Sequence, residues 1–122
     1  MPESWKFSAL KTGSGDVLLD WLNGDAKLQA RLDSYLRRLK EMNPPWPFPI
    51  YRPLGSGVGE IRFDLRKVEH RVYGFFGPGR REFTVILASS DKKTQKRDIQ
   101  TAKELRAAYQ LNRPTTEPYD VT

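Results

Sequence analysis

A two-residue alternation of apolar and polar positions predicts a pair of adjacent β-strands over residues 58–65 and 68–76. Residues 83–89 are rich in β-branched side chains and follow a turn that contains glycine and proline, which predicts another strand. A weaker alternation over residues 5–9 predicts a short strand near the N-terminus. Most of the expected sheet therefore comes from the second half of the chain.

Helical periodicity is clearest over residues 26–42. Leucines recur there at intervals of three and four residues, and Asp25 is placed to cap the N-terminus. A shorter helix is expected over residues 16–22, after a glycine-rich turn. The last helix is expected over residues 99–110, with Asp98 as its cap.

Two segments are expected to lack regular structure. Residues 43–53 contain five prolines among eleven positions, which argues against both helix and strand. Trp46 and Phe48 are expected to hold this segment against the body of the domain. Residues 112–122 contain two further prolines and are expected to form a loose C-terminal tail.

The predicted element order is β-α-α-β-β-β-α, which indicates an α+β fold. We expect a single domain over residues 1–111, built on a mostly antiparallel sheet of about four strands. The helices are expected to cover one face of that sheet and to leave the other face partly open.

The most specific local prediction is a hairpin over residues 58–76 with Arg66-Lys67 as its two-residue turn. This register places Arg62 directly opposite Arg71, and opposed residues of an antiparallel pair share a face. The side chains predicted on the open face are Glu60, Arg62, Asp64, Glu69, Arg71 and Tyr73. This face is either a ladder of solvated ion pairs or a site where two guanidiniums hold a phosphate. On an open face, truncation of Arg71 is expected to cost little stability.

The basic charge of the chain is concentrated in the same region. The sequence has a formal net charge of +6, and residues 52–106 carry thirteen Lys and Arg against seven Asp and Glu. A localised basic excess favours a polyanionic partner. The basic run Lys92–Arg97 follows the strand at residues 83–89, so it is expected to reach the edge of the sheet near the arginine pair.

Composition excludes or disfavours several kinds of site. The chain has no cysteine, which excludes disulfides and thiolate chemistry, and its single His disfavours a zinc site built from several imidazoles. His70 has the opposite parity from Arg71 and is expected to be a half-buried core residue. No stretch approaches the ~20 apolar residues of a membrane span. We therefore expect a cytoplasmic protein that uses no metal and no cofactor.

Three motifs, in this order along the chain, resemble the RelE/HigB-like toxins of type II toxin–antitoxin systems, especially their phage-derived branch. Leu54–Arg62 resembles the pattern L-G-x-G-x-x-E-L-R that leads into the sheet of those toxins. His70–Tyr73 resembles their Y-R-V-x-Y/F strand. Asp91–Lys96, with Ala102 in the next helix, resembles their segment F-x-K-K-T-Q-K-T-P…A. The resemblance extends over residues 5–110.

The resemblance implies a ribosome-dependent endoribonuclease that cuts mRNA without a metal, through attack of a ribose 2′-hydroxyl on the adjacent phosphate. The implied catalytic residues are Arg71, Arg62, Lys93 and Tyr73. The implied RNA-binding residues are Lys92, Lys96, Arg97, Arg66 and Lys67. Because arginine is a poor acid or base at its ordinary pKa, the arginines are expected to act electrostatically. The implied partners are the ribosome, mRNA and a cognate helix-turn-helix antitoxin.

Two other functions stay open at the level of the sequence. ParE-like toxins use the same fold to poison DNA gyrase without cutting RNA, and fold alone does not decide between these activities. A phage protein that binds a host factor through the same basic face, without catalysis, is the third interpretation.

Overall fold

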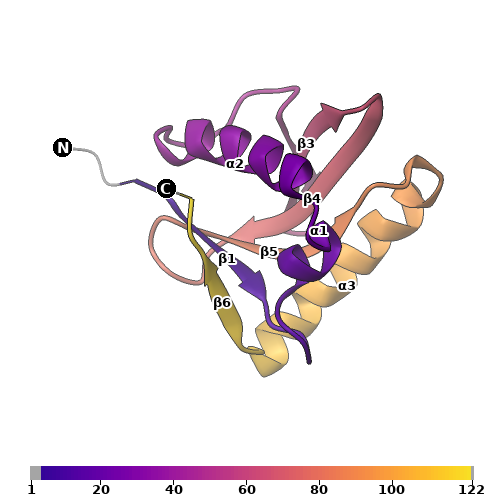
Figure 1. Ribbon diagram of the computed structural model, residues 1–122. Coiled ribbons are helices and arrows are strands. Elements are labelled where there is room, and N and C mark those ends of the chain that lie inside the picture. Colours follow the sequence, from indigo (N-terminus) through magenta and orange to yellow (C-terminus); the bar gives the residue numbers. More distant parts are fainter. Residues whose placement is uncertain (1–3, 122) are drawn as a thin grey trace.

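The structure, a computed structural model, describes residues 4–121, which form a six-stranded mixed sheet flanked by helices (Figure 1). The helices are α1 (Val17–Leu22), α2 (Ala26–Lys40) and α3 (Gln95–Asn112), and a short 3-10 turn, η1 (Lys92–Thr94), precedes α3. The strands are β1 (Lys6–Leu10), β2 (Tyr51–Gly55), β3 (Val58–Leu65), β4 (Val68–Phe76), β5 (Glu82–Ser89) and β6 (Thr116–Tyr119). They lie in the order β2-β3-β4-β5-β1-β6. The β1–β5 pair is parallel and the other neighbouring pairs are antiparallel, so the predicted α+β class and mostly antiparallel sheet are confirmed.

The central hairpin of β3 and β4 has the predicted register. Arg62 lies opposite Arg71, and Arg66 and Lys67 form the turn. Both turn residues have a positive φ, 55° and 65°, which suits the twist of the strands although neither residue type favours it. The pairing of two long strands therefore overrides an unfavourable turn sequence, and the two arginines share one face of the sheet.

Helices cover both faces of the sheet, so the prediction that they pack on one face alone is wrong. Val72 belongs to the larger core, which joins the sheet to α1 and α2, whereas the next residue, Tyr73, belongs to a second core beneath α3. Successive residues of a strand point to opposite faces, so the two cores lie on opposite sides of the sheet. The second core also contains Val58, Phe75, Ile86, Ala102 and Tyr109. The apolar side of α3 thus covers part of the face that was expected to stay open.

The sheet has two strands more than the sequence predicts. β2 begins at Tyr51, inside the segment expected to be irregular, and pairs with β3. Pro53 is tolerated in β2 because this is an edge strand, on which one row of backbone groups needs no partner. β6 lies within the residues expected to form a loose tail, where it pairs with β1 and buries Tyr119. The prediction of a loose tail is therefore wrong for residues 116–119.

Aspartate caps explain where the first two helices begin. The carboxylate of Asp16 accepts hydrogen bonds from the backbone N–H groups of Leu18 and Leu19, at 2.9 Å each. The carboxylate of Asp25 accepts one from Leu28 at 3.0 Å, which confirms the predicted cap of α2. These local signals are complete within a few residues, which is why the sequence places both helix starts correctly.

The third helix begins earlier than predicted. α3 starts at Gln95, so Asp98 lies in its first turn instead of preceding the helix, and Asp98 accepts a hydrogen bond from the Thr94 hydroxyl at 2.6 Å. Lys96 and Arg97 consequently belong to the first turn of a helix and not to a loop. Among the helices within residues 4–121, none is long and apolar enough to cross a membrane.

The proline-rich segment is held by one aromatic side chain and not by two. Trp46 is 3% exposed and packs its ring against Phe76 and Phe83, with centroid distances of 5.0 and 5.4 Å. Phe48 is 75% exposed, contrary to the prediction. It lies in a turn closed by a 3.0 Å hydrogen bond from the Tyr51 N–H to the Pro47 carbonyl, and its side chain faces solvent.

Candidate functional site

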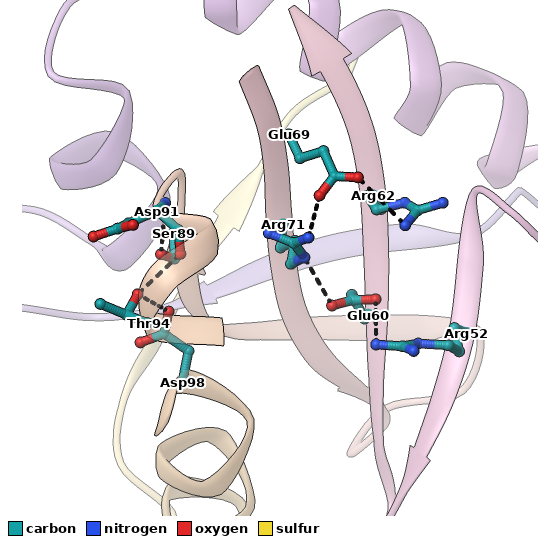
Figure 2. Close-up of polar contacts among 9 residues, drawn as sticks. All are labelled: Arg52, Glu60, Arg62, Glu69, Arg71, Ser89, Asp91, Thr94 and Asp98. Atoms are coloured by element: carbon teal, nitrogen blue, oxygen red, sulfur yellow. Dashed lines mark hydrogen bonds and ion pairs between the residues drawn. The ribbon is translucent and has the colours of Figure 1, made fainter. Parts of the chain in front are cut away.

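Five charged side chains form a continuous row of ion pairs across β2, β3 and β4 (Figure 2). In order, the members of this arginine–glutamate row are Arg52, Glu60, Arg71, Glu69 and Arg62. Arg52 Nη2 lies 3.1 Å from Glu60 Oε2, and Glu60 Oε1 lies 3.3 Å from Arg71 Nε. Arg71 Nη2 donates to Glu69 Oε2, and Glu69 Oε1 lies 3.6 Å from Arg62 Nη1. Three guanidiniums against two carboxylates leave the row with a net charge of +1.

Strand register explains why the row forms. Arg62 and Arg71 are opposed across β3 and β4, and like charges in that position repel each other. Glu60 lies two residues before Arg62 and Glu69 two residues before Arg71, so each carboxylate lies on the same face as the arginines. The alternating signs along the row remove the repulsion that the arginine pair alone would create.

The middle of the row is buried. Arg71 and Glu60 are each 2% exposed, whereas the side chains of Glu69 and Arg62 are 30% and 36% exposed. The prediction that Arg71 lies on an open face is therefore wrong. The reason is tertiary: β5 pairs with β4 beside Arg71, and α3, which follows in the same segment, packs over this face of the sheet. A buried guanidinium depends on its carboxylate partners, because water no longer solvates its charge.

Tyr73 lies beneath the same segment and does not reach solvent. It is 0% exposed, and its hydroxyl has no hydrogen-bond partner among the described residues. Burial raises the pKa of Tyr73, and the nearby Glu60 carboxylate raises it further. The phenol is therefore held neutral inside the second core, a position that does not suit the catalytic role that the resemblance implies for Tyr73.

The basic segment expected to bind RNA begins beside Arg71. Ser89, the last residue of β5, is the cross-strand partner of Arg71, and η1 follows three residues later. The basic side chains on η1 and the first turn of α3 are exposed: Lys92, Lys93, Lys96 and Arg97. The carboxylate of Asp91 accepts a hydrogen bond from the Lys93 backbone N–H at 2.9 Å, so it caps the turn. The structure therefore begins this basic segment three residues after the cross-strand partner of Arg71.

The remaining two predicted residues lie apart from the row. Arg66 and Lys67 form the tip of the hairpin, and Arg66 is four residues, or roughly 13 Å of strand, beyond Arg62. Arg66 Nη1 lies 3.1 Å from Asp25 Oδ2. The pKa of Asp25 is lowered, first by the backbone N–H of Leu28 and then by Arg66. The tip is thus tied to the start of α2 and does not belong to the row.

His70 is a core residue, as its parity predicts. It is 7% exposed and stacks on Phe63, with ring centroids 5.4 Å apart. Its Nδ1 lies 2.7 Å from the Ser90 hydroxyl, which accepts a 2.9 Å hydrogen bond from the Trp21 indole. Burial lowers the pKa of His70, which favours the neutral ring. Within residues 4–121, no group of three or more side chains suited to hold a metal comes together.

Arg52 is the member of the row that sequence reasoning missed. It lies in the proline-rich segment, whose composition argues against a strand, and it pairs with Glu60 only because β2 exists. A usable signal is nevertheless present in Gly55-Ser56-Gly57, a turn sequence with positive φ at all three residues. Extending strand pairing back from that turn places Arg52 opposite Glu60.

Two hollows in the surface lie away from the row. One, of about 810 Å³, lies near the start of β1 and β5, and its lining includes Trp5, Lys6, Lys40, Arg80, Arg81 and Asp120. The other, of about 520 Å³, lies between the β2–β3 turn and α3, and its lining includes Ser56, Lys103 and Arg106. None of the residues predicted from the sequence lines either hollow. Neither of these two hollows therefore contains the row.

A protein-family model matches most of the chain. Residues 20–109 match the family described as Phage derived protein Gp49-like (DUF891). The matched region runs from α1 to the last turns of α3, so it contains the whole arginine–glutamate row and the exposed basic segment. No curated protein and no solved structure matches the chain significantly.

Proposed function

The chain belongs to the Gp49-like family of phage-derived proteins, which is related to toxin–antitoxin systems, and we propose that it is a RelE/HigB-type toxin that cuts mRNA on the ribosome. The observation that carries the proposal is the placement of Arg62 and Arg71 side by side, with exposed lysines on the adjoining segment. Guanidiniums bind phosphate oxygens at two points, and lysines attract the phosphate backbone as point charges. A cognate helix-turn-helix antitoxin, the ribosome and mRNA are the proposed partners.

The proposed reaction is a metal-independent transesterification within the RNA. The ribose 2′-oxygen gives its proton to a water molecule and bonds to the adjacent phosphorus, while the bond from phosphorus to the next 5′-oxygen breaks. A proton from the solvent is delivered to that leaving oxygen, so the products are a 2′,3′-cyclic phosphate and a 5′-hydroxyl. Negative charge increases on the phosphate oxygens in the transition state, which is the charge that a guanidinium stabilises.

The exposure of each side chain decides which role in RNA binding or cleavage we assign to it. Arg62 is the exposed guanidinium that meets the phosphate, with Arg71 behind it. Lys93 assists the leaving oxygen. The residues proposed to hold the RNA backbone are Lys92, Lys96 and Arg97, with Arg66 and Lys67 farther along at the hairpin tip. Tyr73 is assigned a packing role instead of contact with RNA, because its hydroxyl is buried.

The test is cleavage of a defined mRNA by the purified protein in a reaction that contains ribosomes. Arg62→Ala should lower the cleavage rate by about 100-fold, the typical effect of removing an oriented donor to a developing oxyanion. Arg38→Ala is the matched control, because Arg38 is also exposed but lies on α2, and its truncation should leave cleavage unchanged. Equal activity of the two variants would contradict the assigned role of Arg62.

Assays on the wild-type protein separate the three candidate functions. Ribosome-dependent cleavage supports the proposal. Inhibition of gyrase supercoiling without RNA cleavage would instead identify a ParE-like poison. If neither activity is found at high protein concentration, the function is that of a protein that binds a host factor without catalysis.

A further inference from the structure

We propose that Glu69 occupies the phosphate position of the arginine–glutamate row, so that the row receives a phosphodiester only when the Glu69 carboxylate moves out to solvent. The inference rests on the proposed function, because it names the position at which that site would take the phosphate of RNA. It assigns Glu69 as an internal competitor that controls access to Arg71.

The geometry of Glu69 is that of a bridging oxyanion. One carboxylate oxygen accepts from Arg71 Nη2, and the other lies 3.6 Å from Arg62 Nη1 (Figure 2). A phosphate placed between two guanidiniums presents one oxygen to each in the same manner. The Glu69 carboxylate therefore marks where the phosphate oxygens would lie.

Of the two carboxylates in the row, Glu69 is the one that can rotate out to solvent, because it is less buried than Glu60. Its side chain is 30% exposed, whereas that of Glu60 is 3% exposed and pairs with both Arg52 and Arg71. Rotation of Glu69 toward water breaks its ion pairs with Arg62 and Arg71 but leaves Arg71 paired with Glu60. Displacement of Glu60 would instead leave a buried carboxylate and a buried guanidinium apart. Glu60 is thus a fixed part of the site and Glu69 the exchangeable part.

Two nitrogens of the Arg71 guanidinium already face carboxylates. Its Nε faces Glu60 at 3.3 Å, its Nη2 faces Glu69, and the whole residue is only 2% exposed. A ligand that binds Arg71 Nη2 must therefore take the position that Glu69 fills. When Glu69 has moved away, three arginines and one glutamate remain in the row, with a net charge of +2. One phosphodiester carries a charge of −1, so its binding restores the net charge of +1 that the row has with Glu69 in place.

The test measures phosphate binding without asking for catalysis. The probes are inorganic phosphate and a short 2′-O-methyl oligoribonucleotide, which lacks the 2′-hydroxyl needed for cleavage. Glu69→Gln keeps the shape of the side chain but removes the negative charge that competes with phosphate. We expect it to bind both probes on the order of tenfold more tightly, which corresponds to removing one charge-assisted competitor.

Asp64→Asn is the matched control. Asp64 is the cross-strand partner of Glu69 and shares its face, but it is exposed and its carboxylate forms no ion pair within the described residues. Both variants raise the net charge of this face by one, so a general electrostatic effect would strengthen binding equally. The control should gain roughly twofold or less. Equal gains, or no gain in Glu69→Gln, would overturn the inference.

A measurement on the unmodified protein guards against a variant that folds poorly. Titration of the wild type with phosphate should shift the ¹³C resonance of the Glu69 carboxyl carbon more than that of Asp64. An unchanged Glu69 resonance at saturating phosphate would also overturn the inference. Because neither experiment requires cleavage, a protein that cuts no RNA but binds phosphate more tightly as Glu69→Gln would refute the proposed function and retain the anion position.

Discussion

Arg71 is held by carboxylates on two sides, and its neighbours depend on it in return. It pairs with Glu60 and Glu69, and Glu60 is almost as buried as Arg71 itself. The desolvation cost of both charges is offset only while they face each other. The burial of Arg71 therefore reverses the expectation that its truncation costs little stability.

Arg71→Ala is expected to lower the free energy of unfolding by about 3 kcal/mol, because it leaves the Glu60 carboxylate buried with Arg52 as its remaining partner. Arg62→Ala is the control, since Arg62 and its partner Glu69 are both partly solvated, and should cost less than about 1 kcal/mol. Urea denaturation of both variants measures the difference. Similar losses would mean that the burial of the central pair contributes nothing to stability.

At the scale of elements, β6 connects the end of the chain to the larger core. It pairs with β1, and Tyr119 packs into the core while its hydroxyl donates to Asp33 Oδ1 on α2 at 2.7 Å. Burial raises the pKa of Tyr119, and the hydrogen bond to Asp33 raises it further. The strand is thus joined both to the sheet and to a helix.

Tyr119→Phe is expected to cost about 1 kcal/mol at neutral pH, the usual value of one hydrogen bond. Because the pKa of Tyr119 is raised by folding, its stabilising effect is complete below about pH 10 and is lost as the pH rises above that value. The variant lacks this titration, so its stability should fall less steeply than that of the wild type in alkali.

Thermal unfolding of both proteins between neutral and alkaline pH tests the expected role of Tyr119. Tyr35→Phe is the control, because the Tyr35 hydroxyl has no hydrogen-bond partner within residues 4–121. An alkaline slope for Tyr119→Phe that equals the wild-type slope would show that β6 does not hold Tyr119 buried in solution.

At the scale of the whole molecule, charge is distributed unevenly along the chain. Residues 1–51 carry seven Lys and Arg against six Asp and Glu, so the first half, which supplies α1 and α2, is nearly neutral. The net charge of +6 over residues 52–106 belongs to the segment that supplies β3, β4, β5 and most of α3, and it includes the row. A concentrated basic excess attracts polyanions.

Binding of the 2′-O-methyl oligoribonucleotide should therefore weaken steeply with salt, because cations are released from the RNA on binding. Lys93→Ala should reduce the slope of log affinity against log salt concentration by about 0.7, the share of one phosphate contact on a single strand. Lys27→Ala, an exposed lysine on α2, should leave the slope unchanged. A flat salt response of the wild type would contradict the whole charge argument.

The strand pairing of Arg62 with Arg71 could be derived from the sequence because a sheet face is decided by a period of two residues. The placement of Lys92–Arg97 near that pair followed from chain connectivity. Arg52 could not be placed in the same way, because proline composition indicates where strands are disfavoured and not where an edge strand is tolerated. The burial of Arg71 likewise could not be predicted from the residues next to it in the sequence.

The sequence by itself determined the hairpin register, the start of α1, the cap of α2, the basic half of the sequence and the core position of His70, because each depends on residues that are close in the chain or on simple periodicity. Only the tertiary structure decided that α3 covers part of the polar face, that residues 116–119 form a sixth strand, and that Arg71 and Tyr73 are buried. The physical reason is that burial is a property of contacts between distant segments. An alternating strand specifies which residues share a face, but the packing of another element decides whether that face meets water.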